Sequence, residues 1–183
     1  MPTQTFARAA RFLALLVLLS LMPALGRQAQ AQTDTPNLVV IPGTLQSKLG
    51  CPGDWQPECQ NTALAFSEAD GIWRGEFELP VGSYDYKVAL NGSWDENYGG
   101  LAQRNGPNIA LALAQPTTVR FYYDHRTHWV TDSVNATIAA VIGDFQSELG
   151  CAEDNSPSCL AGWLQDPEGD GTYLFVTNAI PAG

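Results

Sequence analysis

The chain contains an internal repeat with an offset of 100 residues. The sequence GTLQSKLGC at positions 43–51 returns as GDFQSELGC at positions 143–151, and LPVG at 79–82 returns as IPAG at 180–183. Between these stretches, Asp54, Pro57 and Cys59 return as Asp154, Pro157 and Cys159. A period of this length suits one β-sandwich domain and exceeds the ~20–50 residues of a solenoid unit. We therefore expect a complete first module followed by about the first half of a second.

The N-terminus has the pattern of a secretory signal peptide. Arg8 and Arg11 precede an apolar run from Phe12 to Met22, which is shorter than the ~20 residues of a membrane span. Pro23 ends the run, and the sequence AQA ending at Ala31 offers the small residues that cleavage needs. We expect a secreted, extracellular protein cleaved after Ala31. An N-terminal membrane anchor is the alternative.

The expected mature chain is strongly acidic. The full sequence has 9 basic and 19 acidic residues, and three of the basic ones lie before residue 32, so cleavage leaves a net charge of −13. Such a charge repels nucleic acid and anionic membranes, so we expect neither as a partner. It is compatible with an uncharged ligand such as a sugar.

The four cysteines form two pairs with identical spacing, Cys51/Cys59 and Cys151/Cys159. A secreted chain permits disulfides, and each pair would close a small loop within its own module. The alternative, a zinc site, would need closer spacing and nearby histidines, whereas the chain has 2 His in all. We predict two local disulfides.

Short runs with alternating apolar residues, bounded by Gly, Pro, Asn and Asp, predict an all-β sandwich. In the run 72–79, Trp73, Phe77 and Leu79 should face the core, and in the run 83–90 Lys87 should point away from it. Half a sandwich buries too little to offset its ordering entropy, so we expect the second copy alone to fold poorly. The predicted strands are 38–41, 63–66, 72–79, 83–90, 109–113 and 117–123, then 137–142, 161–165 and 173–177 in the second copy.

No catalytic motif is visible. The sequence has no Gly-x-Ser-x-Gly, no phosphate-binding Gly-rich loop and no His-Glu-x-x-His. A glycosidase needs two carboxylates held across a cleft, and no acid here has a recognisable glycosidase context. We therefore expect a non-catalytic chain that needs no cofactor.

The stretch from Tyr84 to Gly99 carries the clearest candidate for a binding site. Lys87 should point off the core face, and Trp94 follows the tight-turn signal Asn91-Gly92. An exposed indole can stack on the apolar face of a pyranose ring, and an amine beside it can donate hydrogen bonds to hydroxyls. The alternative is that Trp94 folds back as a cap over the edge of the sandwich.

Three stretches of the sequence resemble the X25-type module of pullulanases and amylopullulanases, which are secreted starch-debranching enzymes. The resembling stretches are QSKLGCPGDWQPEC at 46–59, YKVALNGSWDENYG at 86–99 and FYYDHRTHWVTD at 121–132. The resemblance implies immunoglobulin-like β-sandwich modules in tandem, without catalytic residues and N-terminal to a family-13 glycoside hydrolase barrel.

A more distant similarity to starch- and glycogen-binding modules implies which residues touch sugar. Those modules share a loop Trp, a strand Lys, a Trp after a turn and an Asn-Ile pair that opens the next strand. The matching residues are Trp55, Lys87, Trp94 and Asn108. The second copy has Asn155 in place of Trp55 and ends before any equivalent of Lys87, so we expect one site, in the first copy.

Two other segments contain residues that could bind a metal ion. The run Asp124 to Trp129 contains both histidines of the chain, although capping and turn hydrogen bonds are the alternative. Asp166, Glu168 and Asp170 resemble a calcium loop but lack the closing Glu of an EF-hand. A calcium-dependent adhesion module is therefore a further hypothesis.

The sequence thus predicts a signal peptide (1–31), a first X25-like module (32–132) and the N-terminal half of a second (133–183). The expected function is a non-catalytic accessory segment that binds α-glucan (starch, glycogen or pullulan) beside the catalytic barrel of a longer enzyme. The alternatives are a structural spacer without a ligand, and a fragment whose parent performs the glycoside hydrolysis that these residues cannot.

Overall fold

The computed structural model describes residues 35–180, so the expected signal peptide and its cleavage site lie outside the described residues. Nine strands and three short 3-10 helices make up the regular structure of these described residues. Within residues 35–180, no helix has the length and apolar character to span a bilayer. The elements are β1 (Val39–Val40), η1 (Gln46–Leu49), η2 (Gln60–Thr62), β2 (Ala63–Ser67), β3 (Ile72–Leu79), β4 (Gly82–Tyr86), β5 (Val88–Leu90), β6 (Asn97–Tyr98), η3 (Gly100–Ala102), β7 (Ile109–Leu113), β8 (Thr117–Asp124) and β9 (Trp129–Asp132).

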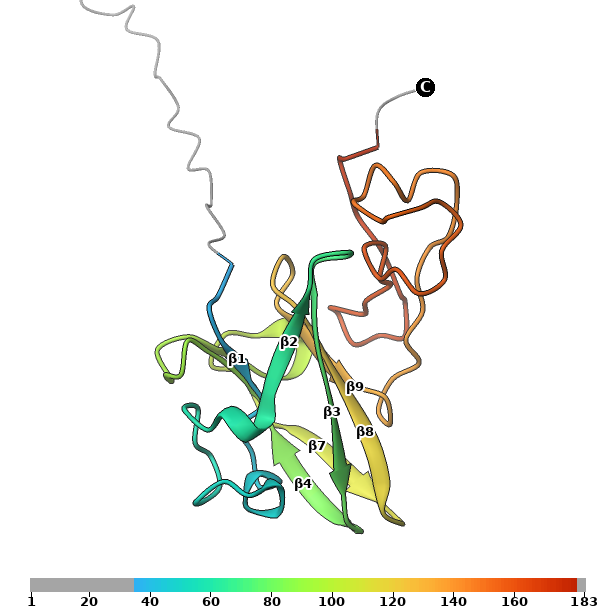
Figure 1. Ribbon diagram of the computed structural model, residues 1–183. Helices are drawn as coiled ribbons and strands as arrows, with labels where there is room; N and C mark the ends of the chain where they lie inside the picture. Colours follow the sequence, from blue (N-terminus) through green and yellow to red (C-terminus); the bar gives the residue numbers. More distant parts are fainter. Residues whose placement is uncertain (1–34, 181–183) are drawn as a thin grey trace, which may run out of the picture. The chain divides into compact units, whose positions relative to one another are not determined.

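The strands form two antiparallel sheets that pack as a β-sandwich, as the sequence predicts. The larger sheet has the order β6-β5-β1-β2-β3-β8-β9, and the smaller one pairs β4 with β7. Figure 1 shows β2, β3, β8 and β9 running side by side. The longest ladder joins β3 to β8, with Ile72 opposite Asp124 at one end and Leu79 opposite Thr117 at the other.

One hydrophobic core lies between the two sheets. Trp73 and Leu79 of β3 are buried in it, with Phe77 packed against it, so the predicted core face of this strand is confirmed. Tyr86 of β4 and Phe121 of β8 meet edge to face, with ring centroids 5.0 Å apart. Aromatic side chains from both sheets therefore fill the space between the layers.

The predicted single strand 83–90 is wrong, because the chain changes sheets at Lys87. β4 pairs with β7, whereas β5 pairs with β1 and β6. The amide of Lys87 bonds to the carbonyl of Pro42, 3.0 Å away, at the point where the chain crosses over. Ala89 of β5, a strand with β1 on one side and β6 on the other, is fully buried.

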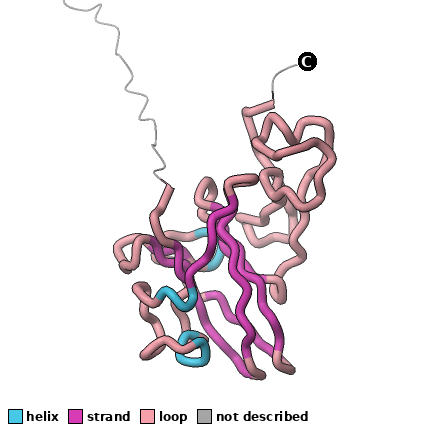
Figure 2. The backbone as a smooth tube through the Cα atoms, viewed as in Figure 1, coloured by secondary structure: helices cyan, strands magenta, loops and turns pink. Residues whose placement is uncertain are grey.

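The second copy has no strand within residues 133–180, so its three predicted strands are also wrong. Figure 2 draws this segment as loop throughout. Two isolated bridges remain, Ala140 opposite Trp163 and Gln165 opposite Leu174. They repeat, at an offset of 100, the pairs Val40–Ala63 and Ala65–Arg74 of the first copy. The second copy therefore keeps the register of the first without the neighbouring strands that would extend it into ladders.

Both predicted disulfides are present. Cys51 bonds to Cys59 and Cys151 to Cys159, each with a Cα–Cα distance of 6.0 Å. Strand β9 runs to Asp132, the last residue of the expected first module, so the connection between the copies begins at residue 133.

A buried glutamine fixes the first disulfide loop. The side-chain oxygen of Gln46 accepts the amide of Gln56 at 2.7 Å, and its nitrogen donates to the carbonyl of Gln56 at 2.9 Å and to the Thr62 hydroxyl at 3.0 Å. Gln146 makes the same pair of bonds to the backbone of Ser156 in the second copy. The repeated Gln therefore serves as an internal backbone clamp for each loop.

Gln46→Ala should lower the free energy of unfolding by about 2–3 kcal/mol, because it leaves the half-buried N–H and C=O of Gln56 and the buried Thr62 hydroxyl without their Gln46 partner. Urea unfolding of the full chain measures this difference. Gln60→Ala, at an exposed position of the same loop region, is the control and should change stability by less than about 0.5 kcal/mol. Equal effects of the two substitutions would contradict the role of Gln46.

Candidate glucan-binding site

The four residues predicted to touch sugar come together around one hollow. Trp55, Lys87, Trp94 and Asn108 line a shallow surface depression of about 350 Å³. They come from four separate segments: the disulfide loop, the crossover between β4 and β5, the turn after β5 and the residue before β7. Their convergence therefore depends on the whole fold of the first copy.

The two indoles form an angled apolar platform. The ring centroids of Trp55 and Trp94 lie 6.3 Å apart, and the ring planes are tilted by 40°. Trp94 keeps 39% of its surface exposed, so it does not fold away as a buried cap. Trp55 is half-buried, and its exposed part adjoins the same hollow.

The backbone holds Trp55 in a conformation that disfavours bulky side chains. Its φ angle is 60°, in the left-handed region. Its amide bonds to the carbonyl of Gly43, and the next residue, Gln56, is held by the Gln46 clamp. Conformations of this kind cost roughly 1–3 kcal/mol and cluster at binding sites, where the surrounding structure imposes them.

Asn97 positions two of the lining residues, a role that nothing in the sequence indicates beyond its place in the YKVALNGSWDENYG stretch. Its side chain is buried and donates to the carbonyl of Trp94 at 3.0 Å. Its oxygen lies 3.4 Å from Nζ of Lys87, which donates to it. One amide thus holds the turn that carries Trp94 and orients the lysine beside it.

Asn108 is exposed at the start of β7, at the edge of the hollow. The preceding residue, Pro107, accepts the amide of Gly100 at 2.9 Å. A Cβ at Gly99 would collide with the same carbonyl oxygen, so glycine is needed there for the close approach. This contact fixes where the segment carrying Asn108 enters the sheet.

The second copy keeps the loop scaffold but not its indole. Asn155 has a φ angle of 56°, and its amide bonds to the carbonyl of Gly143 at 3.0 Å, as Trp55 does to Gly43. Asparagine tolerates this conformation better than tryptophan. The larger side chain in the first copy is therefore not there for the sake of the backbone.

The two histidines form a hydrogen-bonded chain with Tyr98 and Tyr123. The Tyr98 hydroxyl donates to Glu96 and faces Nε2 of His128 at 3.2 Å. The Tyr123 hydroxyl lies 3.0 Å from Nδ1 of both His125 and His128. Among residues 35–180, no three His, Cys, Asp or Glu side chains are grouped to share a metal ion.

Burial shifts the pKa values of Tyr98 and His128 in this hydrogen-bonded group of side chains. It raises the pKa of Tyr98 to about 12, assisted by the hydrogen bond to Glu96. Burial, with the nearby His125, also lowers the pKa of His128 below its usual value. His128 also stacks on Tyr98, with ring centroids 3.9 Å apart, so a neutral imidazole is favoured at this position.

The acids of the suggested calcium loop are engaged by the backbone. Asp166 accepts the amides of Gly169, Asp170 and Gly171, and Asp170 accepts that of Thr172. These bonds form a turn, and Glu168 takes no part in them. A second hollow of about 430 Å³, lined in part by Arg126, contains none of the predicted sugar-binding residues.

The family profile of the pullulanase X25 domain matches residues 38–130 and 138–183, that is, both copies of the repeat. The chain belongs to the X25 domain family. All four residues around the hollow fall within the first matched segment. The second match shows that residues 138–183 are also X25 sequence, although they contain no strand up to residue 180.

Curated relatives of this X25 chain are amylopullulanases. The enzyme of Thermoanaerobacterium thermosulfurigenes is 37% identical over 98 residues, which is 54% of this chain and 5% of the relative. That of Thermoanaerobacter thermohydrosulfuricus is 37% identical over 100 residues, or 55% of this chain and 7% of the relative. The chain thus matches less than a tenth of the length of these relatives.

Among solved structures, the pullulanase from Bacillus acidopullulyticus is similar, with 33% sequence identity and a TM-score of 0.47. The match covers 54% of this chain and 11% of that one.

Trp55→Asn should change the free energy of unfolding by less than about 1 kcal/mol, because Asn tolerates a φ of 60° and stands at the equivalent position 155. Trp55→Val removes the same ring but places a β-branched residue there, and should cost about 2 kcal/mol. Urea unfolding compares the two variants. If both lose the same stability, packing of the indole and not backbone conformation decides the choice of residue.

The pH dependence of stability should report the buried His128. A folded-state pKa below the unfolded value of 6.5 means that the unfolded chain binds more protons, so unfolding becomes easier as the pH falls below about 6.5. Urea midpoints between pH 7.5 and 5 should fall more steeply for the wild type than for His128→Asn, which suits the positive φ at this position. Parallel curves for the two proteins would contradict this assignment.

Proposed function

We propose that the chain is a secreted, non-catalytic accessory segment of a starch-debranching enzyme, and that its first X25 module binds α-glucan. The observation that carries this proposal is the convergence of Trp55, Lys87, Trp94 and Asn108 on one exposed hollow. The names of the relatives, amylopullulanases, agree with it. A catalytic barrel in a longer parent chain belongs to the same proposal.

The chemistry of the hollow suits a neutral sugar chain. Each indole offers an apolar face to the C–H side of a glucose ring, and two planes tilted by 40° suit neighbouring rings of the curved α-1,4 chain. Lys87 and Asn108 supply hydrogen-bond donors, and Asn108 also supplies an acceptor, for hydroxyl groups at the rim. The lining contains no carboxylate, whereas glycoside hydrolysis uses two. The hollow is therefore suited to holding glucan without cleaving it.

Secretion rests on two features of the chain. The N-terminal pattern is that of a signal peptide, and both disulfides are of the kind that forms and persists in an oxidising compartment.

Affinity electrophoresis tests the binding. The purified chain should be retarded in a gel that contains soluble starch or glycogen, and Trp94→Ala should lose most of this retardation, as loss of a stacking platform would require. Trp55→Asn should weaken it while leaving stability almost unchanged, which separates binding from folding. Pullulan hydrolysis by the purified chain would refute the non-catalytic part of the proposal.

Charge-matched controls make the result specific. Lys87→Ala should weaken retardation, because it removes a donor from the hollow. Lys48→Ala removes an exposed lysine from η1, outside the hollow, and should leave retardation unchanged. If the wild type migrates equally with and without glucan, the module is a spacer without a sugar ligand.

A further inference from the structure

The outer face of β3 and β8 has an apolar end. Along most of this face the side chains are charged, and Glu76 pairs with Arg120 at 2.6 Å. At the other end, next to the β2–β3 turn, the same face carries Ile72 and Tyr122, and Ile72 is fully buried. An isoleucine on an otherwise charged face predicts that something covers it.

The second copy covers this end of the face. Leu160 and Trp163 form a hydrophobic cluster with Ile72, and Tyr122 and Trp129 pack against it. Trp163 is 2% exposed and Leu160 is 7% exposed, although the segment that carries them contains no strand. The rings of Trp163 and Tyr122 have centroids 5.9 Å apart. The second copy thus buries Leu160 and Trp163 against the first copy.

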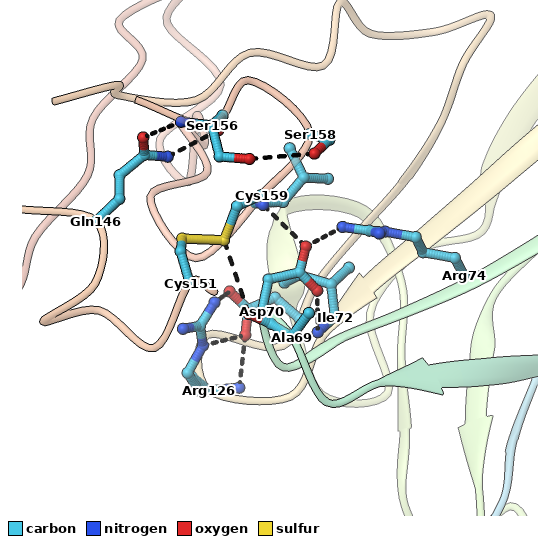
Figure 3. A network of polar contacts seen from close by, with 12 residues as sticks. Ala69, Asp70, Ile72, Arg74, Arg126, Gln146, Cys151, Ser156, Ser158 and Cys159 are labelled. Atoms are coloured by element: carbon cyan, nitrogen blue, oxygen red, sulfur yellow. Dashed lines mark hydrogen bonds and ion pairs between the residues drawn. A yellow bond between two sulfur atoms is a disulfide. The ribbon is translucent and has the colours of Figure 1, made fainter. Parts of the chain in front are cut away.

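Polar contacts fix the position of the covering segment, and Figure 3 shows them around Asp70. The buried carboxylate of Asp70 accepts the amide of Leu160 at 2.8 Å and pairs with Arg74. The disulfide sulfur of Cys159 also packs against the carbonyl oxygen of Ala69, 3.7 Å away. At the far side of the cluster, Nε2 of the Gln165 side chain donates to the Asp124 carboxylate at 3.2 Å.

The repeat shows that these contacts are particular to the second copy. The bridges Ala140–Trp163 and Val40–Ala63 establish that Trp163 and Ala63 are equivalent in structure as well as in sequence. Where the second copy has Leu160, Trp163 and Gln165, the first has Gln60, Ala63 and Ala65. The first-copy side chains are partly or fully exposed, whereas those of the second copy are buried.

We propose that the outer face of the first module is a docking surface for the segment that follows the disulfide loop of the second copy, and that docking orders both this segment and the loop. The surface consists of Asp70, Ile72, Tyr122, Asp124 and Trp129, and its occupant is the segment 159–165. The two copies are then one rigid body and not two domains that move independently on a flexible linker. The described residues accordingly belong to a single compact unit.

Only one of the two copies carries side chains that can dock, so the contact joins the copies in one order. A surface and a loop that both existed on every module would let separate molecules join head to tail without closing. The equivalent segment 59–65 of the first copy has Gln60, Ala63 and Ala65 at these positions, so it has no large apolar side chain there to insert into the docking surface. The arrangement therefore joins the first copy to the second and leaves the first-copy loop, with Trp55, free for a ligand.

Hydrogen exchange on the full chain tests the docking. In the wild type, the amide of Leu160 should exchange slowly, and Asp70→Asn should speed its exchange roughly tenfold or more by removing its charged acceptor. Asp170→Asn is the matched control, because Asp170 caps Thr172 in the same way as Asp70 caps Ile72. This control should leave the exchange of Leu160 unchanged.

A second variant guards against a simple loss of the turn at Asp70. Tyr122→Thr keeps a strand-forming residue on β8 but removes the ring against Trp163, and should speed exchange throughout 146–165 while β3 and β8 stay protected. Unprotected amides at 146–165 in the wild type would overturn the proposal. Protection that is the same in the wild type, Asp70→Asn and Tyr122→Thr would overturn it too, because the loop would then be ordered without the first copy.

Discussion

The clamp of a buried glutamine amide on the backbone of a disulfide loop supports both the proposed glucan site and the proposed docking contact. Gln46 and Gln146 are fully buried, and each both donates to and accepts from one residue of its loop. A primary amide can satisfy a backbone N–H and C=O together, which an apolar side chain cannot. The disulfide closes the loop, and the amide fixes its conformation. Trp55 in the first loop and Leu160 just beyond the second therefore have defined positions.

On this shared scaffold the two loops have diverged toward different contacts. In the first loop Trp55 has a strained backbone conformation, and its indole adjoins the hollow. The segment after this loop carries the small or polar residues Gln60 and Ala63. The second loop has Asn155, which tolerates the same positive φ better than tryptophan, and the segment just beyond it places Leu160 and Trp163 against the first copy. Each loop thus has its large apolar groups where the other has none. We regard binding by one loop and docking by the other as the simplest account of this exchange.

The alternation of apolar residues and the spacing of the cysteines were enough to predict features that depend on residues close together in the sequence. Alternation along β3 placed Trp73 in the core, and equal Cys spacing gave both disulfides, because these depend on neighbours in sequence. The crossover at Lys87 was missed, since alternation continues through a residue where only the hydrogen-bonding partner changes. The second-copy strands were wrongly predicted, because a strand needs a partner as well as a suitable sequence. The sequence feature that indicates docking is the apolar Ile72 among the charged residues on one face of β3. The resemblance named the four residues around the hollow, but Asn97, which positions two of them, is recognisable only from its contacts.

The connection between the copies is itself held by the first module, which bears on how rigid the pair can be. Asp132 at the end of β9 is fully buried, accepts the Tyr86 hydroxyl at 2.7 Å and accepts the amides of Val134 and Asn135. Burial beside this carboxylate raises the pKa of Tyr86 well above its usual value, so the phenol keeps the proton that it donates. The chain is therefore held by the first module as far as residue 135, and Ile138 already packs against the cluster of Ile72, Leu160 and Trp163. Only two residues lie between these anchors, too few to act as a flexible hinge once the loop has docked.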